Sequence, residues 1–247
     1  MKRFLLALTF WGAVCGNLSA CAAELKVMTV GLVGSRSFQT LAATWSQKTG
    51  NTVKLVIPPS ALDQVLAAMK TQDADAVLLP VSEFPAQASQ FRPGTARPIG
   101  RVLFGLGARL DGLKPRIATE AAFKTALAGR TVLINDPATS LNGRMAKAML
   151  DGPGFETVKV QGIYSAAAAL AKSNADYVIT VLPEEVTLSS LTLLGEVPPA
   201  LGLKIDFGGG VLNKAANPEL AAQFLDYLVS ADAVSVWKAG GVTAPVP

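Results

Sequence analysis

The sequence contains no histidine, and its two cysteines, Cys15 and Cys21, both lie close to the N-terminus. The rest of the chain therefore offers no thiol nucleophile, no disulfide, no imidazole base and none of the usual soft-metal ligands. Charged residues are also sparse, because Asp, Glu, Lys and Arg together make up 16% of the 247 residues. These absences argue against histidine- or cysteine-dependent catalysis, and we predict neither a metal site nor a cofactor.

One long apolar run follows Lys2 and Arg3 and extends from Phe4 to Ala23, where it becomes rich in small residues. This pattern is typical of an export signal. No later run reaches the roughly 18 apolar residues that a membrane-spanning helix needs. We expect residues 1–23 to form a signal peptide. Removing Lys2 and Arg3 lowers the formal net charge from +4 to +2, so the basic balance does not indicate nucleic-acid binding, and we expect no nucleic-acid partner.

The end of this signal allows two processing routes. Residues 18–21, Leu-Ser-Ala-Cys, resemble the bacterial lipobox, in which the cysteine is acylated and becomes the new N-terminus. An ordinary cut after Ala22 or Ala23 also fits the small-residue rule. Lipidation at Cys21 would anchor the protein on the outer face of the inner membrane, whereas the plain cut would release it into the periplasm.

Apolar strands alternate with amphipathic helices along the remaining chain. Residues 25–33 and 75–80 are nearly continuous in apolar residues, as expected of strands buried on both faces of a parallel sheet. Such alternation favours an α/β fold with crossover helices, long enough for one large domain or two lobes of about 100 residues. The expected strands are 25–33, 52–57, 75–80, 101–109, 130–135, 175–182 and 191–197, and the expected helices include 37–49, 62–69, 119–127, 162–173, 218–230 and 231–239.

The segment 131–150, TVLINDPATSLNGRMAKAML, starts as a buried strand, breaks into small polar residues and continues as a helix. Asp136 precedes a proline at the strand exit, a position where aspartate commonly forms an Asx-turn or a cap. The break leads into a helix N-terminus, whose free N–H groups and dipole favour an anion. In open α/β sheets, ligands bind at such strand exits.

Three stretches resemble one protein family: TLAATWSQKTGNTVKLVIPPSALDQVLAAM, INDPATSLNGRMAKAML and NPELAAQFLDYLVSADAVSVWKAGG. In order and spacing they are similar to the molybdate-binding proteins of ABC transporters, within the type II periplasmic binding proteins. The resemblance covers nearly the whole chain after the signal. It implies a two-lobe α/β fold that closes around a ligand, with lobe one formed by residues 24–97 and 202–247 and lobe two by residues 98–201.

The resemblance also implies which loops hold the ligand, although several family residues differ here. Val33 stands where the family has a serine, prolines replace the glycines of the second loop, and Thr180 stands near an expected tyrosine. An arginine fork suits a carboxylate, so we expect a ligand other than molybdate. The candidate ligand contacts are Ser35, Arg36, Ser37, Ser60, Asn142, Gly143, Arg144 and Thr180. For the serines, helix capping is the alternative, and for the arginines, solvation or a surface ion pair.

Other conspicuous residues favour structural interpretations. Glu184 and Glu185 are adjacent and do not face each other in regular structure, which argues against an acid–base pair. The glycines 208–210 lack the lysine of a phosphate loop and indicate a close approach of neighbouring strands or of a ligand. Trp45 and Trp237 fall at helical spacing and indicate packing positions.

Together these features predict an exported, non-catalytic binding protein, a monomer. Its expected partners are a small anionic solute, either a molybdate-like oxyanion or a small carboxylate, and an ABC permease of the inner membrane. An enzyme of the dehydratase or lyase type on the same fold is the first alternative. A sensor without a transport role is the second.

Overall fold

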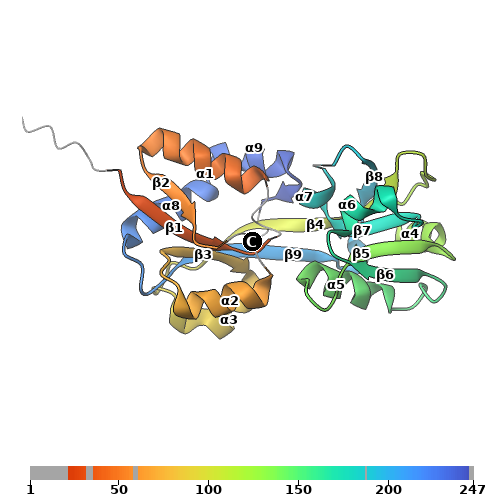
Figure 1. Ribbon diagram of the computed structural model, residues 1–247, viewed down its shortest axis with the longest axis horizontal. Helices are drawn as coiled ribbons and strands as arrows, with labels where there is room; N and C mark the ends of the chain where they lie inside the picture. Colours follow the sequence, from red (N-terminus) through yellow and green to blue (C-terminus); the bar gives the residue numbers. More distant parts are fainter. Residues whose placement is uncertain (1–21, 32–35, 58–60, 187, 245–247) are drawn as a thin grey trace, which may run out of the picture.

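The computed structural model describes residues 22–31, 36–57, 61–186 and 188–244 of the chain. Cys21, Ser35 and Ser60 lie outside these described residues, as does nearly all of the predicted signal peptide. The described residues form a mixed β-sheet with helices packed on both of its faces, elongated along one axis (Figure 1).

The sheet has the strand order β2-β1-β3-β9-β4-β7-β5-β6, and β8 and β10 also pair with β4. Its strands are β1 (Glu24–Thr29), β2 (Thr52–Leu55), β3 (Ala76–Pro80), β4 (Arg97–Arg109), β5 (Thr131–Asn135), β6 (Lys159–Ile163), β7 (Tyr177–Val181), β8 (Leu191–Glu196), β9 (Lys204–Val211) and β10 (Val242–Thr243).

Strand β4 belongs to two halves of this sheet. Its residues 97–103 pair antiparallel with β9, next to the parallel strands β3, β1 and β2. Its residues 104–108 pair antiparallel with β7, next to the parallel strands β5 and β6. We call these the first and the second sheet half. Both parallel groups are built from strand–helix–strand units, the connection that parallel pairing requires.

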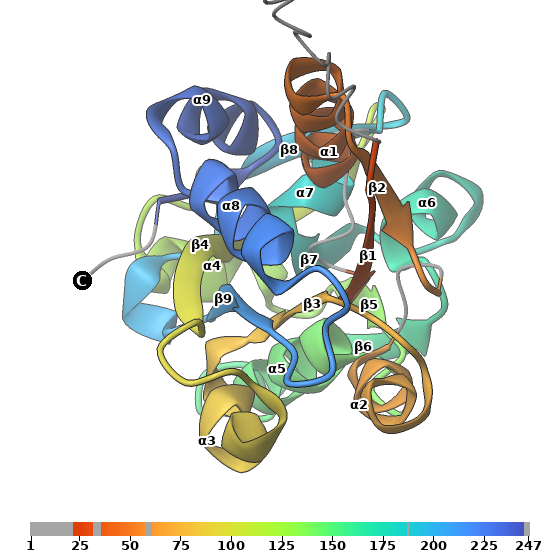
Figure 2. The same cartoon turned by 90° about the vertical axis from the view of Figure 1, so that its left-hand side faces the viewer.

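Helices cover both sheet halves. The α-helices are α1 (Arg36–Thr49), α2 (Leu62–Thr71), α3 (Phe84–Gln87), α4 (Glu120–Leu127), α5 (Leu141–Leu150), α6 (Ala166–Ala169), α7 (Leu182–Glu185), α8 (Pro218–Leu228) and α9 (Ala231–Ala239). Short 3-10 turns lie at η1 (Val81–Glu83), η2 (Ala88–Gln90), η3 (Leu170–Lys172) and η4 (Pro199–Leu201). On the first sheet half, α1, α8 and α9 lie on one face and α2 and α3 on the other (Figure 2).

The core lies between the sheet and these helices. All residues of β3 and of β7 are buried, which explains their continuous apolar sequence, since helices cover both faces. Trp45 packs edge-on against Phe224 of α8, and Trp237 packs edge-on against Phe207 of β9. Both tryptophans are buried, so the packing role predicted for them is confirmed.

The glycines 208–210 allow close approach within the first sheet half. A Cβ atom on Gly208 would lie 2.3 Å from the carbonyl oxygen of Arg97, and one on Gly210 would lie 2.5 Å from the Phe91 ring. Neither space can hold a side chain without a shift of its neighbours. Of the two possibilities predicted for this run, the close approach of neighbouring strands is confirmed.

Most of the expected elements form near their predicted positions, but the helix expected at 162–173 is wrong. Residues Gly162 and Ile163 belong to β6, where they pair with β5. The helical part is α6 and the turn η3, which follow Ser165 in the left-handed region. The run of alanines led the sequence analysis to predict a helix. The pairing of residues 162–163 with β5 depends on a strand that is distant in the chain, and intrinsic propensity carries no information on such a partner. The lobe boundaries at 97/98 and 201/202 stay a prediction.

Candidate functional site

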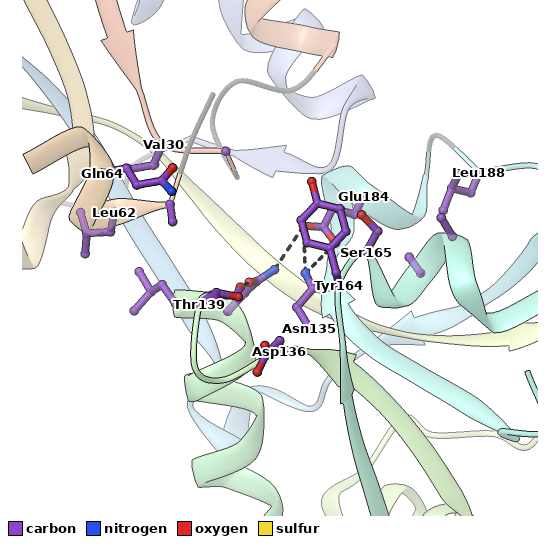
Figure 3. Close-up of a pocket in the computed structure, with 17 residues that line it drawn as sticks. Val30, Leu62, Gln64, Asn135, Asp136, Thr139, Tyr164, Ser165, Glu184 and Leu188 are labelled. Atoms are coloured by element: carbon purple, nitrogen blue, oxygen red, sulfur yellow. Dashed lines mark hydrogen bonds between the residues drawn. The ribbon is translucent and has the colours of Figure 1, made fainter. Parts of the chain in front are cut away.

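A cavity of about 770 Å³ opens where the carboxyl ends of strands from both sheet halves meet. From the first half it is lined by the end of β1 and the start of α2, and from the second by the β5–α5 and β6–α6 turns and by α7 (Figure 3). We call this cavity the cleft. Its lining residues are Val30, Gly31, Ala61, Leu62, Gln64, Asn135, Asp136, Thr139, Ser140, Leu141, Asn142, Tyr164, Ser165, Ala167, Ala168, Glu184 and Leu188.

The β5–α5 turn is shaped by hydrogen bonds of its own side chains. Asp136 Oδ1 accepts a 3.0 Å hydrogen bond from the backbone N–H of Ala138, so the Asx-turn expected at this strand exit is confirmed. Ser140 is the N-cap of α5, and its hydroxyl accepts from the N–H of Gly143 at 3.3 Å. The turn therefore directs the first residues of α5 to the cleft wall.

Gly143 brings α5 against the end of β5. A Cβ atom at this position would lie 2.1 Å from the carbonyl oxygen of Asn135 and 2.7 Å from its carbonyl carbon. Since these are backbone atoms at the end of a buried strand, they cannot move aside easily. Glycine at position 143 is what allows the first turn of α5 to sit directly behind the cleft wall.

Two helices of ten residues begin at the cleft, one from each sheet half. The N-cap of α2 is Ala61, whose side chain has no acceptor for the N–H groups of the first turn. The first turn of α5 contains no acidic residue, and that of α2 contains Asp63, which is not among the lining residues. N–H groups at helix starts carry partial positive charge and bind anions. The cleft thus has a donor-rich end on each side.

A polar network forms the wall of the second sheet half. The carboxylate of Glu184 accepts from the hydroxyl of Thr180 at 2.7 Å, from Nδ2 of Asn135 at 3.1 Å and from Nδ2 of Asn142 at 3.2 Å. The side-chain oxygen of Asn135 accepts from the backbone N–H of Ala166 at 2.8 Å. These four side chains come from β5, α5, β7 and α7, so the network joins the elements that surround the cleft (Figure 3).

Tyr164 projects at the open side of the cleft, and 87% of its surface is exposed. The next residue, Ser165, has φ 53° and ψ 54°. Within the described ranges it is the one non-glycine residue with positive φ. A left-handed serine between β6 and α6 is an uncommon backbone state, and it directly follows an exposed aromatic residue of the lining.

Glu185, next to Glu184, points away from the cleft into the core, where it is 1% exposed. Neither of its carboxylate oxygens makes a hydrogen bond of normal geometry within the described part of the chain. Burial raises the pKa of Glu185 well above its usual range, opposed in part by the Thr180 backbone N–H, and the charge of Glu184 adds to the rise. The two carboxylates therefore occupy different environments.

Residues 33–243 match the family described as "Bacterial extracellular solute-binding protein". The chain belongs to this family. A curated relative, the aconitate isomerase of a Pseudomonas species, is 22% identical over 227 residues, which cover 88% of this chain and 86% of the relative.

Two solved structures are similar to this solute-binding protein over nearly all of its length. The substrate-binding domain of a molybdenum ABC transporter described as putative, from Clostridium difficile, superimposes with a TM-score of 0.73 at 12% identity, covering 91% of this chain and all of that one. The periplasmic molybdate-binding protein of Azotobacter vinelandii gives a TM-score of 0.70 at 18% identity, covering 90% and 100%. The predicted periplasmic-binding-protein fold is confirmed.

Within the described ranges, no helix combines the length and the apolar character of a membrane span.

The structure brings together only part of the predicted contact set of this solute-binding protein. Asn142 lines the cleft, Gly143 lies directly behind it, and Thr180 is buried in the polar network that holds Glu184. Arg144 is exposed and is not among the lining residues. The location of a residue does not show that it contacts a ligand, so ligand contact stays a prediction for each of these residues.

Arg36 and Ser37 lie elsewhere, at a separate depression of about 460 Å³ between α1, α7 and α9. Ser37 is buried there, and its hydroxyl fills the space that a Cβ atom on Gly240 would need, at 1.7 Å. The start of α1 is thereby packed tightly against the end of α9. In this arrangement neither residue lines the cleft.

Sequence reasoning missed Asn135, Tyr164 and Glu184 as cleft residues. Each follows or ends a strand: Asn135 closes β5, Tyr164 follows β6, and Glu184 comes three residues after β7. The signal that could have found them is their position at the carboxyl ends of parallel strands. For Tyr164 that signal was hidden, because β6 was not expected.

Proposed function

We propose that this solute-binding protein is exported and serves an ABC importer, in which it captures a small anion between two lobes and delivers it to a permease in the inner membrane. The observation that carries the proposal is the cleft, which collects strand ends and helix starts from both sheet halves. Two N-termini of ten-residue helices that face one cavity suit an anion. The similarity to molybdate-binding structures supports the fold that this function uses.

Closure would take place around β4 and β9. These strands run through the region between the lobes proposed at residues 24–97 with 202–247 and at 98–201, and they are the two segments that cross it. Small rotations in two strands can bring the start of α2 towards the start of α5. We propose a monomer without a cofactor, either free in the periplasm or anchored through Cys21.

The ligand contacts follow from this arrangement. In lobe two, the first turn of α5 would bind through the backbone N–H group of Asn142, Gly143 would let this turn lie close to the ligand, and Thr180 would hold the wall in place. In lobe one, Ser35 and Ser60 would contribute hydroxyls, whereas the Ser37 hydroxyl packs against Gly240 in this arrangement and would reach the ligand only after α1 moves. Arg36 and Arg144 remain proposals that alanine substitution tests, since a lost charge-assisted hydrogen bond costs about 1.5–3 kcal/mol.

An enzyme is the second candidate, and one observation favours it. Glu184 places a carboxylate in the cleft, and a carboxylate can act as a base in proton abstraction. A relative of this chain is named aconitate isomerase, an enzyme that acts on a small organic acid. A sensor that uses the cleft without a permease is a further alternative, which the presence of neighbouring permease and ATPase genes would argue against.

Calorimetry and turnover assays on the mature protein separate these candidates. Molybdate, tungstate, sulfate, phosphate, citrate and cis- and trans-aconitate should be titrated, and each mixture should be followed by NMR. Binding with 1:1 stoichiometry and an unchanged ligand supports a transport protein. Conversion of a bound acid to an isomer would instead establish an enzyme.

Hydrogen exchange tests the closure itself. A bound anion should slow exchange at residues 133–144 and at 61–65, on the two sides of the cleft, while α4 and α9 serve as internal controls. Protection on one side alone would contradict a two-lobe clamp.

A further inference from the structure

The charge of the cleft lining does not match a site for a bare anion. Among the lining residues that the structure describes, Asp136 and Glu184 are acidic and none is Lys or Arg. The N–H groups at the helix starts can bind an anion in this cleft, but the carboxylate of Glu184 repels it. Ligand groups of two kinds are therefore needed, acceptors towards the helix starts and a donor towards Glu184.

Glu184 cannot easily swing out of the lining, because three side chains hold it. The amide orientations are fixed independently: the oxygen of Asn135 accepts from Ala166 N–H, and the oxygen of Asn142 accepts from Gly143 N–H at 3.1 Å. Both amides must then turn their NH₂ groups towards Glu184. The carboxylate is thus presented as an acceptor at a fixed place.

The remaining lining suits a carbon skeleton. Apolar or aromatic side chains of Leu62, Leu141, Tyr164 and Leu188 surround the polar groups. The cleft volume of about 770 Å³ falls within the range of sites for organic molecules, about 300–1,000 Å³. A tetrahedral oxyanion has no apolar part to place against these residues.

We infer that the ligand is a hydroxylated organic anion, such as a small hydroxycarboxylate, whose hydroxyl donates to Glu184 while its anionic group binds the starts of α2 and α5. This inference rests on the proposed function and narrows its ligand class. A hydroxyl suffices as the donor, because the amides and Thr180 already offset the charge of Glu184. A carboxylate that accepts from a ligand hydroxyl discriminates strongly against the analogue that lacks it.

Matched ligand pairs test the inference by calorimetry: citrate against tricarballylate, and malate against succinate, with molybdate as the bare oxyanion. Within each pair the members differ by one hydroxyl. In the wild-type protein the hydroxylated member of at least one pair should bind tenfold or more tightly than its partner. Glu184→Gln should reduce that ratio at least fivefold, and Glu196→Gln, which removes an exposed charge outside the lining, should leave it unchanged.

The possible failures are distinguishable. Tighter binding of molybdate or of the hydroxyl-free members, or a ratio that Glu184→Gln does not change, overturns the inference and leaves the transport proposal standing. Conversion of a bound hydroxy acid overturns the transport proposal, but the inference about the ligand class still holds. If no probe binds, both fail for small anions. Thermal melting of Glu184→Gln verifies that the variant folds. If it does not fold, the affinity ratios of the wild-type protein still test the inference.

Discussion

The carboxylate of Glu185 occupies the space that a side chain on Gly105 would need: a Cβ atom there would lie 2.3 Å from Glu185 Oε2. Gly107, two residues on, faces the other oxygen, with a hypothetical Cβ at 3.6 Å from Oε1. The two glycines let α7 lie directly on β4, the strand that both sheet halves share. A buried acid is thereby placed where the two halves join.

The first prediction concerns stability against pH. Because burial raises the pKa of Glu185, the folded protein binds this proton more tightly than the unfolded chain. The associated stability is fully present below the unfolded pKa, about 4.3, and is lost as the pH rises through the folded pKa. Glu185→Gln should therefore raise the free energy of unfolding at neutral pH, by roughly 1–3 kcal/mol.

Urea denaturation of the wild type and Glu185→Gln at pH 4 to 8 measures this difference. The two curves should converge near pH 4, where the wild-type carboxyl is protonated in both states. Glu196→Gln, at an exposed glutamate, is the matched control. A difference that does not vary with pH would show that ionisation of Glu185 is not its cause.

The second prediction concerns Gly143. In Gly143→Ala the new methyl group would meet the carbonyl oxygen of Asn135, at 2.1 Å before relaxation, and must push α5 away from β5. We expect a loss of about 1–3 kcal/mol in the free energy of unfolding, as for other overpacked sites, and weaker ligand binding because the cleft wall moves. Gly112→Ala, at a turn where the nearest contact is 3.3 Å, should change both little. Wild-type stability and affinity in Gly143→Ala would contradict the close contact.

The third prediction concerns Asp75, which is 1% exposed. Its two oxygens accept 2.8 Å hydrogen bonds from the backbone N–H groups of Lys26 and Asn217, joining β1 to the residue before α8. Asp75→Ala leaves both donors buried, so the free energy of unfolding should fall by about 3 kcal/mol or more. Asp75→Asn keeps one acceptor and should lose less. Asp73→Ala, two residues earlier and exposed, is the control, and an equal loss in all three would refute the role of these bonds.

The fourth prediction concerns processing. Intact-mass analysis of the protein from an expressing bacterium should show that residues 1 to about 20 are absent, because the N-terminal run is typical of an export signal. Retention of Met1 would refute this.

Cys21→Ser then separates the two processing routes. If the cysteine is acylated, the variant should move from the membrane fraction to the soluble one, since acyl chains supply the anchor. If the cut lies after Ala22 or Ala23, fractionation should not change.

The sequence predicted the fold class because its strands are buried on both faces and carry continuous apolar runs, as in β3 and β7. It predicted the cleft wall at 136–143 because a strand, a polar break and a helix follow one another locally. It did not predict β6, whose residues are mostly exposed and which is recognisable only from its pairing with β5. Pairing partners that lie far apart in the chain leave no local pattern.

Glu184 shows the same limit within the site. The sequence placed the strand at 175–182, with an acidic pair after it, whereas β7 ends at Val181 and Leu182 begins the four-residue helix α7. That short helix turns one glutamate to the cleft and the next into the core. Its direction is set by Gly105 and Gly107 of β4, about 80 residues earlier in the chain.

The position of β9 also bears on the order in which the protein can form. Because β9 inserts between β3 and β4, a chain that emerges N-terminus first has its early strands β1 to β3 long before residues 204–211 arrive to cover the edge of β3. Contacts of such long sequence separation form slowly, and an uncovered strand edge invites association with other chains. A chain that crosses the membrane as proposed would thus remain loosely structured until its last fifth has passed. This delay suits the translocation of an unfolded polypeptide. Folding would then be completed on the far side of the membrane, when the C-terminal residues arrive.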